Sequence, residues 1–172
     1  KQEIHSPTHL IRLRQTAPEL LKVAVQAGQF LIDGTFIREE RHGGRKEWVI
    51  MEHDGPGCLT RFWTPYFHYS LDNHRGPNIR IYLDGVQEPV LCENFIELLT
   101  GGDYAGAPAR ENDLSVPRPF ARYTARAGDL YLPIPFAKGC KVTLDKKPFY
   151  NVVNYRAYPA GTPVDTFSRQ AL

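Results

Sequence analysis

The sequence predicts an all-β protein, in which a two-sheet jelly-roll β-sandwich carries one short N-terminal helix. About eight or nine short segments alternate apolar with polar residues, and turn signals separate them at the spacing typical of a β-sandwich. Aromatic residues make up 12% of the chain, and glycine and proline number 14 each, which favours a strand-rich fold with many turns. Strands and helices do not alternate in βαβ order, so a parallel sheet is not predicted.

The clearest strand signal lies in residues 78–90, which are typical of a β-hairpin at the centre of the domain. Apolar residues occupy every second position from Ile79 to Leu83, as in a strand with one buried face. Asp84-Gly85 predicts a two-residue turn, because both central positions of such a turn need positive φ. Val86–Val90 is the predicted returning strand, and its proline favours an edge position.

Other segments complete the predicted domain. Residues 47–53 are apolar on both sides, which favours a central strand. Residues 38–46 form a charged hairpin tip with a Gly-Gly turn, and residues 93–99 form a short helix or turn. In residues 139–145, Cys140, Val142 and Leu144 are expected to point inward. Further strands are predicted at residues 30–38, 58–64, 129–132 and 149–158.

The chain divides into three predicted parts. Residues 1–28 are an N-terminal arm with a short helix, because Thr16–Glu19 is a capping box and helical spacing continues to Gly28. Residues 29–158 are the sandwich. Residues 159–172 are rich in turns and resemble a linker toward a second half that this sequence does not contain.

The bulk composition excludes several classes of partner. The net charge is +2, with 21 basic and 19 acidic residues, and the basic residues are scattered along the chain. This gives no reason to expect nucleic-acid binding. No apolar run reaches the ~20 residues that span a bilayer, so no membrane segment is predicted. Cys58, Cys92 and Cys140 allow at most one disulfide and do not indicate a compartment or a redox state.

The best candidates for ligand contact lie around residues 61–77. Aromatic side chains stack on sugar rings and polar ones bond their hydroxyls, so Arg61, Trp63, Tyr66 and His68 are the predicted carbohydrate-binding residues. An ordinary surface loop is the alternative for residues 65–77. No cofactor and no metal site is predicted, since His5 and His9 are separated by a proline and have no third ligand nearby.

No catalytic residue is predicted. Glu93 and Glu97 are four residues apart and would share a face of a helix, but nothing else marks them as a reacting pair. Glu52 and Asp54 flank a strand end, where turn capping accounts for them.

Five segments, in order along the chain, together resemble one family. They are Arg-Lys-Glu-Trp-Val-Ile-Met-Glu at 45–52, Asp-Gly-Pro-Gly-Cys-Leu-Thr-Arg-Phe-Trp-Thr at 54–64, Ile-Arg-Ile-Tyr-Leu-Asp-Gly at 79–85 with Glu-Pro at 88–89, Leu-Tyr-Leu-Pro-Ile-Pro-Phe-Ala-Lys at 130–138 with Cys-Lys-Val at 140–142, and Asn-Tyr-Arg-Ala-Tyr at 154–158. Over residues 28–168 the chain resembles domain-of-unknown-function family 2961, which corresponds to glycoside hydrolase family 172.

The resemblance implies a subunit of two jelly-roll sandwiches that assembles as trimers or hexamers. It also implies a retaining reaction on furanosides, such as fructofuranosides or arabinofuranosides. The family's nucleophile and acid/base are glutamates in a Gly-Glu-Gly-Asp and a Thr-Glu-Asp-Tyr segment, and neither segment occurs in these 172 residues. The family's early Ser-x-Asp-Arg stretch is not recognisable either.

We therefore expect an N-terminal scaffold half of a furanoside hydrolase that is inactive by itself. Two alternatives stay open: a stand-alone carbohydrate-binding sandwich, and a structural sandwich that drives assembly. The expected partners are a furanoside glycan and further copies of the chain, and a secreted or periplasmic location is favoured over a cytoplasmic one.

Overall fold

The computed structural model describes residues 28–31, 36–65, 76–101, 116, 119–124, 127–148 and 150–171. The predicted N-terminal helix, apart from Gly28, and the pair His5 and His9 lie outside these residues. Within the described part, no helix is long and apolar enough to cross a membrane.

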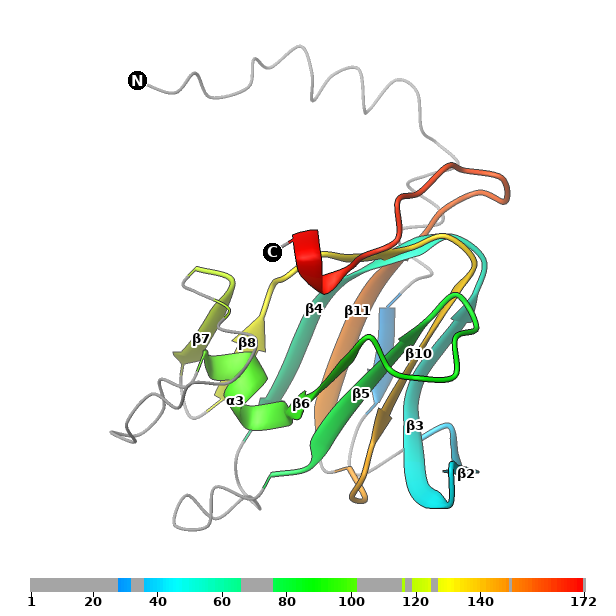
Figure 1. Ribbon diagram of the computed structural model, residues 1–172. Coiled ribbons are helices and arrows are strands. Elements are labelled where there is room, and N and C mark those ends of the chain that lie inside the picture. The colour runs from blue at the N-terminus through cyan, green and yellow to red at the C-terminus, as the bar shows by residue number, and fades with distance from the viewer. Residues whose placement is uncertain are drawn as a thin grey trace, which may run out of the picture.

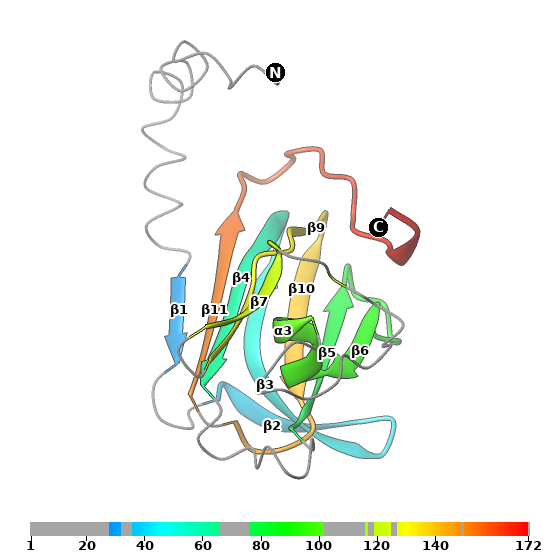
Figure 2. The same ribbon diagram turned by 90° about the vertical axis from the view of Figure 1, so that its left-hand side faces the viewer.

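The described strands form two antiparallel sheets that face each other (Figures 1 and 2). Sheet A has the order β1 (Gly28–Leu31), β11 (Asn151–Ala157), β4 (Gly57–Pro65), β8 (Ala127–Leu130) and β7 (Ala121–Thr124), and β9 (Ile134–Phe136) also pairs with β4. Sheet B has the order β2 (Arg38–His42), β3 (Arg45–Asp54), β10 (Gly139–Leu144), β5 (Asn78–Leu83) and β6 (Leu91–Asn94). The prediction of an all-β sandwich is confirmed.

The core lies between the two sheets and is built from alternate strand positions. Phe62 and Leu130 reach it from sheet A, and Ile81 and Val142 reach it from sheet B, all with no exposed surface. Burial of one such side chain contributes about 1.5–3 kcal/mol, so the inward positions dominate the stability of the fold. Cys140, Val142 and Leu144 are all buried in this core, as predicted.

A short helix, α3 (Phe95–Thr100), lies beside β6, β7 and β8 at one end of the sandwich (Figure 2). The side chain of Asn94 caps its start by accepting hydrogen bonds from the backbone N–H groups of Ile96 and Glu97, at 3.1 and 3.2 Å. Gly101 ends it in the left-handed region, with φ 63°. The prediction of a short helix in this stretch is confirmed, but Glu93 lies in β6, so Glu93 and Glu97 do not share a helix face.

The predicted hairpin forms with a longer connection. Asp84 and Gly85 have φ values of 55° and 78°, and the Val86 N–H bonds the Leu83 carbonyl at 3.1 Å, so the tight turn is present. The returning strand nevertheless begins at Leu91, and the prediction of a strand at Val86–Val90 is wrong. Proline at position 89 has no N–H to donate to a ladder, so pairing resumes only beyond it. The central strand of sheet B is β10, not this hairpin.

The charged segment after residue 37 is a strand rather than only a hairpin tip. Gly43 and Gly44 form the predicted turn, with φ values of 56° and 82°. Arg38–His42 pairs with β3 along its whole length as the outer strand of sheet B. A single strand over residues 30–38 is wrong, because Phe36 and Ile37 separate β1 from β2. Charged side chains suit an edge strand because they discourage pairing with another chain.

The carboxylate of Asp84 joins three distant segments. It accepts hydrogen bonds from the backbone N–H groups of Lys138 and Gly139, at 2.6 and 3.2 Å, and from the hydroxyl of Thr166. The neighbouring Phe167 is buried in the core, and its N–H bonds the Pro135 carbonyl at 2.9 Å. Residues 166–167 therefore pack against the sandwich, and the role of residues 159–172 as a linker stays a prediction.

Replacing Asp84 with asparagine should weaken this junction, because asparagine tolerates positive φ but cannot accept three hydrogen bonds as a charged group. Burial alone would raise the pKa of Asp84, but the hydrogen bonds from Thr166, Lys138 and Gly139 outweigh it and lower that pKa. The stabilisation is therefore complete above the ordinary aspartate pKa and disappears as the pH falls through the lowered one. We expect Asp84→Asn to lose about 1 kcal/mol of unfolding free energy at pH 7.

Thermal unfolding of both proteins between pH 7 and pH 2.5 tests this expectation. The two stabilities should begin to converge below about pH 4, where Asp84 becomes protonated in the unfolded chain, and should meet only below the lowered pKa of the folded protein. Asp165→Asn, at an exposed position on the same C-terminal segment, is the matched control. A constant difference across the whole pH range would contradict the role assigned to Asp84.

Candidate functional site

The strand register gathers polar and aromatic side chains on the outer face of sheet A. Trp63 of β4 is directly opposite Asp129 of β8, and Arg122 of β7 is opposite Asp129 on its other side. Residues directly opposite each other in an antiparallel pair point to the same face. Arg122, Asp129 and Trp63 therefore form one row across three strands.

A second row lies beside the first. Tyr131 follows Asp129 by two residues, and Arg61 precedes Trp63 by two, so each shares a face with its neighbour. The Tyr131 N–H bonds the carbonyl of Phe120 at 2.6 Å, which extends the pairing of β7 with β8 by one position. We call the two rows together the aromatic platform, and its members are Arg61, Trp63, Phe120, Arg122, Asp129 and Tyr131.

An ion pair stabilises the middle of the aromatic platform. Asp129 is 5% exposed and accepts hydrogen bonds from Nε and Nη2 of Arg61, at 3.0 and 2.6 Å, and from the Thr124 hydroxyl at 3.2 Å. Burial alone would lower the pKa of Arg61, but its bonds and attraction to Asp129 outweigh this and raise that pKa. The Arg61 guanidinium therefore keeps its positive charge beside the carboxylate that it binds.

The aromatic rings of the platform stay accessible. Tyr131 is 38% exposed and Phe120 is 43% exposed, while Trp63 is partly buried. The guanidinium carbons of Arg61 and Arg122 lie 5.6 and 5.8 Å from the centre of the Tyr131 ring, within the range of cation–π attraction. Exposed rings beside fixed hydrogen-bonding groups have the chemistry needed to stack on a sugar ring and bond its hydroxyls.

The structure thus brings two predicted site residues together, Arg61 and Trp63, whereas Tyr66 and His68 lie outside the described residues. Sequence reasoning missed the platform's other members. The spacing of Asp129 and Tyr131 around an inward Leu130 was a usable signal, because it places both on an outer face. Nothing in the sequence indicated which strand would lie beside them.

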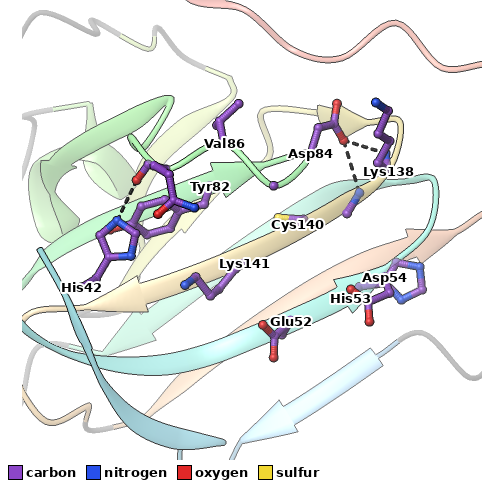
Figure 3. Close-up of a pocket in the computed structure, with 13 residues that line it drawn as sticks. His42, Glu52, His53, Asp54, Tyr82, Asp84, Val86, Lys138, Cys140 and Lys141 are labelled. Atoms are coloured by element: carbon purple, nitrogen blue, oxygen red, sulfur yellow. Dashed lines mark hydrogen bonds between the residues drawn. The ribbon is translucent and has the colours of Figure 1, made fainter.

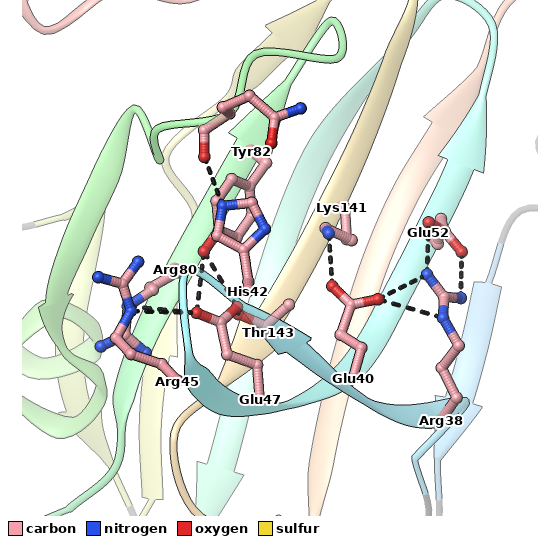
Figure 4. A network of polar contacts seen from close by, with 11 residues as sticks. Arg38, Glu40, His42, Arg45, Glu47, Glu52, Arg80, Tyr82, Lys141 and Thr143 are labelled. Carbon is pink, nitrogen blue, oxygen red and sulfur yellow. Dashed lines mark hydrogen bonds and ion pairs between the residues drawn. The ribbon is translucent and has the colours of Figure 1, made fainter.

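The outer face of sheet B carries a different arrangement, a network of paired charges (Figure 4). Glu47 has no exposed surface, and its carboxylate accepts hydrogen bonds from the hydroxyls of Tyr82, at 3.0 Å, and Thr143, at 2.7 Å. The Nε atoms of Arg45 and Arg80 each lie 3.7 Å from its Oε1 atom. A buried carboxylate is tolerated only with such partners, which makes this cluster a structural element.

A groove of about 430 Å³ lies beside this network, on the same sheet (Figure 3). Two of its charged lining groups are paired, since Glu52 accepts from Arg38 at 2.5 and 2.9 Å and Lys141 donates to Glu40 at 2.5 Å. The His42 ring bonds the Gln87 carbonyl at 2.7 Å and closes one end. The groove is therefore lined by polar and charged groups of both signs, two of which are already paired.

Neither face assembles a recognisable reaction centre. Glu52 is engaged by Arg38, and Glu93 forms an ion pair with Arg169 across the molecule. No group of three or more His, Cys, Asp or Glu residues that could hold a metal ion occurs in the part of the chain that the structure describes. The two acidic side chains that are buried among the described residues, Glu47 and Asp129, each accept hydrogen bonds from two other strands of their own sheet.

Replacing Tyr82 with phenylalanine should destabilise the sandwich by about 1–3 kcal/mol, because Glu47 then loses a buried donor. Burial, and next the hydrogen bond with Glu47, raise the pKa of Tyr82 to about 12. A raised folded-state pKa means that the stabilisation is complete below the unfolded value near 10 and is lost as the pH rises toward 12.

Denaturant unfolding at pH 8 and at steps up to pH 11 measures this difference. The gap between wild type and Tyr82→Phe should begin to narrow above about pH 10. Tyr131→Phe, which changes an exposed tyrosine in the same way, is the control. Equal stability of Tyr82→Phe and wild type at pH 8 would show that the hydroxyl does not support Glu47.

The comparisons with known proteins agree with this architecture. The family description "GH172 first beta-sandwich domain" matches residues 28–172, which is most of the chain. A search of curated proteins found no match. The matched region begins at the first residue of β1 and includes every strand of both sheets, so the chain belongs to glycoside hydrolase family 172 and contains that family's first β-sandwich domain.

Proposed function

We propose that this domain is the scaffold half of a glycoside hydrolase that acts on fructofuranoside or arabinofuranoside glycans, with the catalytic glutamates supplied by polypeptide outside these 172 residues. The observation that carries the proposal is the match to a first sandwich domain, in a sequence that has neither a Gly-Glu-Gly-Asp nor a Thr-Glu-Asp-Tyr segment. The domain then positions a second sandwich and shapes the glycan site.

The contacts of the described carboxylates favour a scaffold role for this domain over a catalytic one. Retaining glycosidases use two carboxyl groups about 5–5.5 Å apart, one as nucleophile and one as acid/base. Glu47 is covered by Tyr82 and Thr143, and Asp129 is held by Arg61 and Thr124. Both carboxylates are buried and already engaged by these donors, so neither is open to a sugar.

The aromatic platform is the proposed glycan contact of this domain. Tyr131, Phe120 and Trp63 supply rings for stacking, and Arg61 donates to sugar oxygens from a position that Asp129 fixes. The proposed assembly is a homotrimer or a hexamer.

Hydrolysis assays on the purified 172-residue chain test the scaffold proposal. We expect no release of reducing sugar from short fructofuranoside or arabinofuranoside oligomers, because no reacting pair of carboxylates is found among the residues that the structure describes. Glu52→Gln and Asp54→Asn, which alter two of the carboxylates that line the groove, are the variants to prepare alongside. Hydrolysis by the wild-type chain that either variant abolishes would overturn the proposal.

A second candidate function is a stand-alone carbohydrate-binding sandwich, and the exposed rings of the aromatic platform favour it. Binding to an immobilised fructo-oligosaccharide should weaken about tenfold in Tyr131→Ala, since truncating a central contact residue commonly costs more than 1 kcal/mol. Trp63→Ala should act in the same direction. Val86→Ala changes an exposed apolar residue in the connection between β5 and β6 and is the control. Unchanged affinity in both platform variants would exclude the platform as the contact.

The assembly proposal has its own measurement. Light scattering coupled to size-exclusion chromatography should give a mass of three or six chains of 19.6 kDa. A single-chain mass at all concentrations up to about 100 μM would mean that this domain alone does not drive association.

A further inference from the structure

The aromatic platform holds more positive charge than its own carboxylate can neutralise. Arg61 and Arg122 both lie over the Tyr131 ring, from β4 on one side and from β7 on the other. Asp129 lies between these strands and is the platform's acidic member. The contacts of Asp129 decide how that charge is distributed.

Asp129 is committed to Arg61. Its Oδ1 accepts both bonds from Arg61, and its Oδ2 accepts from the Thr124 hydroxyl. Arg122 is exposed, and within the described residues it has a ring contact but no carboxylate partner. The guanidinium of Arg122 therefore stands beside an exposed aromatic ring with its hydrogen-bond donors available.

We propose that the aromatic platform binds a sugar that carries an anionic group, with the sugar ring stacked on Tyr131 and Phe120 and the anion paired with Arg122. This inference rests on the proposed glycan contact and narrows its substrate class to acidic glycans. The Arg122 guanidinium carbon lies 5.8 Å from the centre of the Tyr131 ring, so one sugar residue with an anionic group can reach both.

The preference for an anion follows from the chemistry of arginine. A guanidinium presents a planar fork of N–H donors that matches a carboxylate or phosphate with two parallel hydrogen bonds. A hydroxyl can accept from that fork but brings no charge. The cations at the groove on sheet B differ from Arg122, because Arg38 and Lys141 are already paired there with Glu52 and Glu40.

Two oligosaccharide probes with the same sugar chain distinguish recognition of the charge from recognition of the sugar. One is a neutral inulin-type fructo-oligosaccharide, and the other is the same oligosaccharide after carboxymethylation. The chain has two tryptophans, so Trp48→Phe leaves Trp63 as the fluorescent reporter inside the platform. Titrations at low and at moderate salt then give the affinity of each probe.

We expect the carboxymethylated probe to bind about three- to fivefold more tightly at low salt, which is the size of one exposed charge pair. The preference should shrink at moderate salt because exposed charges are screened. Arg122→Gln should abolish it, and Arg122→Lys should keep part of it. Arg41→Gln removes the same charge from an exposed position on sheet B and should change nothing.

The remaining outcomes overturn the inference in distinguishable ways. Equal affinity for both probes would remove the acidic preference and leave the glycan contact standing, whereas binding of neither probe would remove the glycan contact too. Competition by acetate at the same carboxylate concentration would show that the site recognises an anion without a sugar. Tighter binding of poly-glutamate than of the carboxymethylated probe would identify an acidic polypeptide as the partner instead.

Discussion

The alternation of side chains along a β-strand is the constraint on which the rest of this structure depends. Burial of one face of each strand between the two sheets fixes which residues the other face presents to solvent. Leu130 in the core forces Asp129 and Tyr131 outward, and Phe62 does the same for Arg61 and Trp63. The outer faces are thus a consequence of core packing, and a one-residue slip in register would destroy both at once.

The two outer faces use this constraint differently. Sheet A combines exposed rings with one buried ion pair, whereas sheet B neutralises its charges among themselves. Glu47 is the extreme case, since it belongs to the outer face and still has no exposed surface. Its hydrogen bonds offset the cost of burying a charge, although Arg80 Nη1 remains without a partner among the described residues. The outer face of sheet A is consequently the face for which we propose a ligand.

Asp84 gives the sandwich its other organising contact. A turn residue with positive φ directs its carboxylate toward the turn that precedes β10 and toward Thr166 of the C-terminal segment. That junction, together with buried Phe167, makes residues 166–167 part of the folded domain. The family description covers the same residues, so these contacts lie inside the matched region.

The fold class, the strands with alternating apolar residues such as β5 and β10, and the turn at Asp84-Gly85 could be predicted from the sequence, because they follow from local geometry and from the pattern of burial. The sequence also indicated Arg61 and Trp63 as candidate site residues. Only the tertiary structure decided which strands lie side by side. Arg61 and Asp129 are 68 residues apart in sequence, and no local preference specifies their pairing. The same holds for the burial of Glu47, since its partners Tyr82 and Thr143 come from strands 35 and 96 residues away.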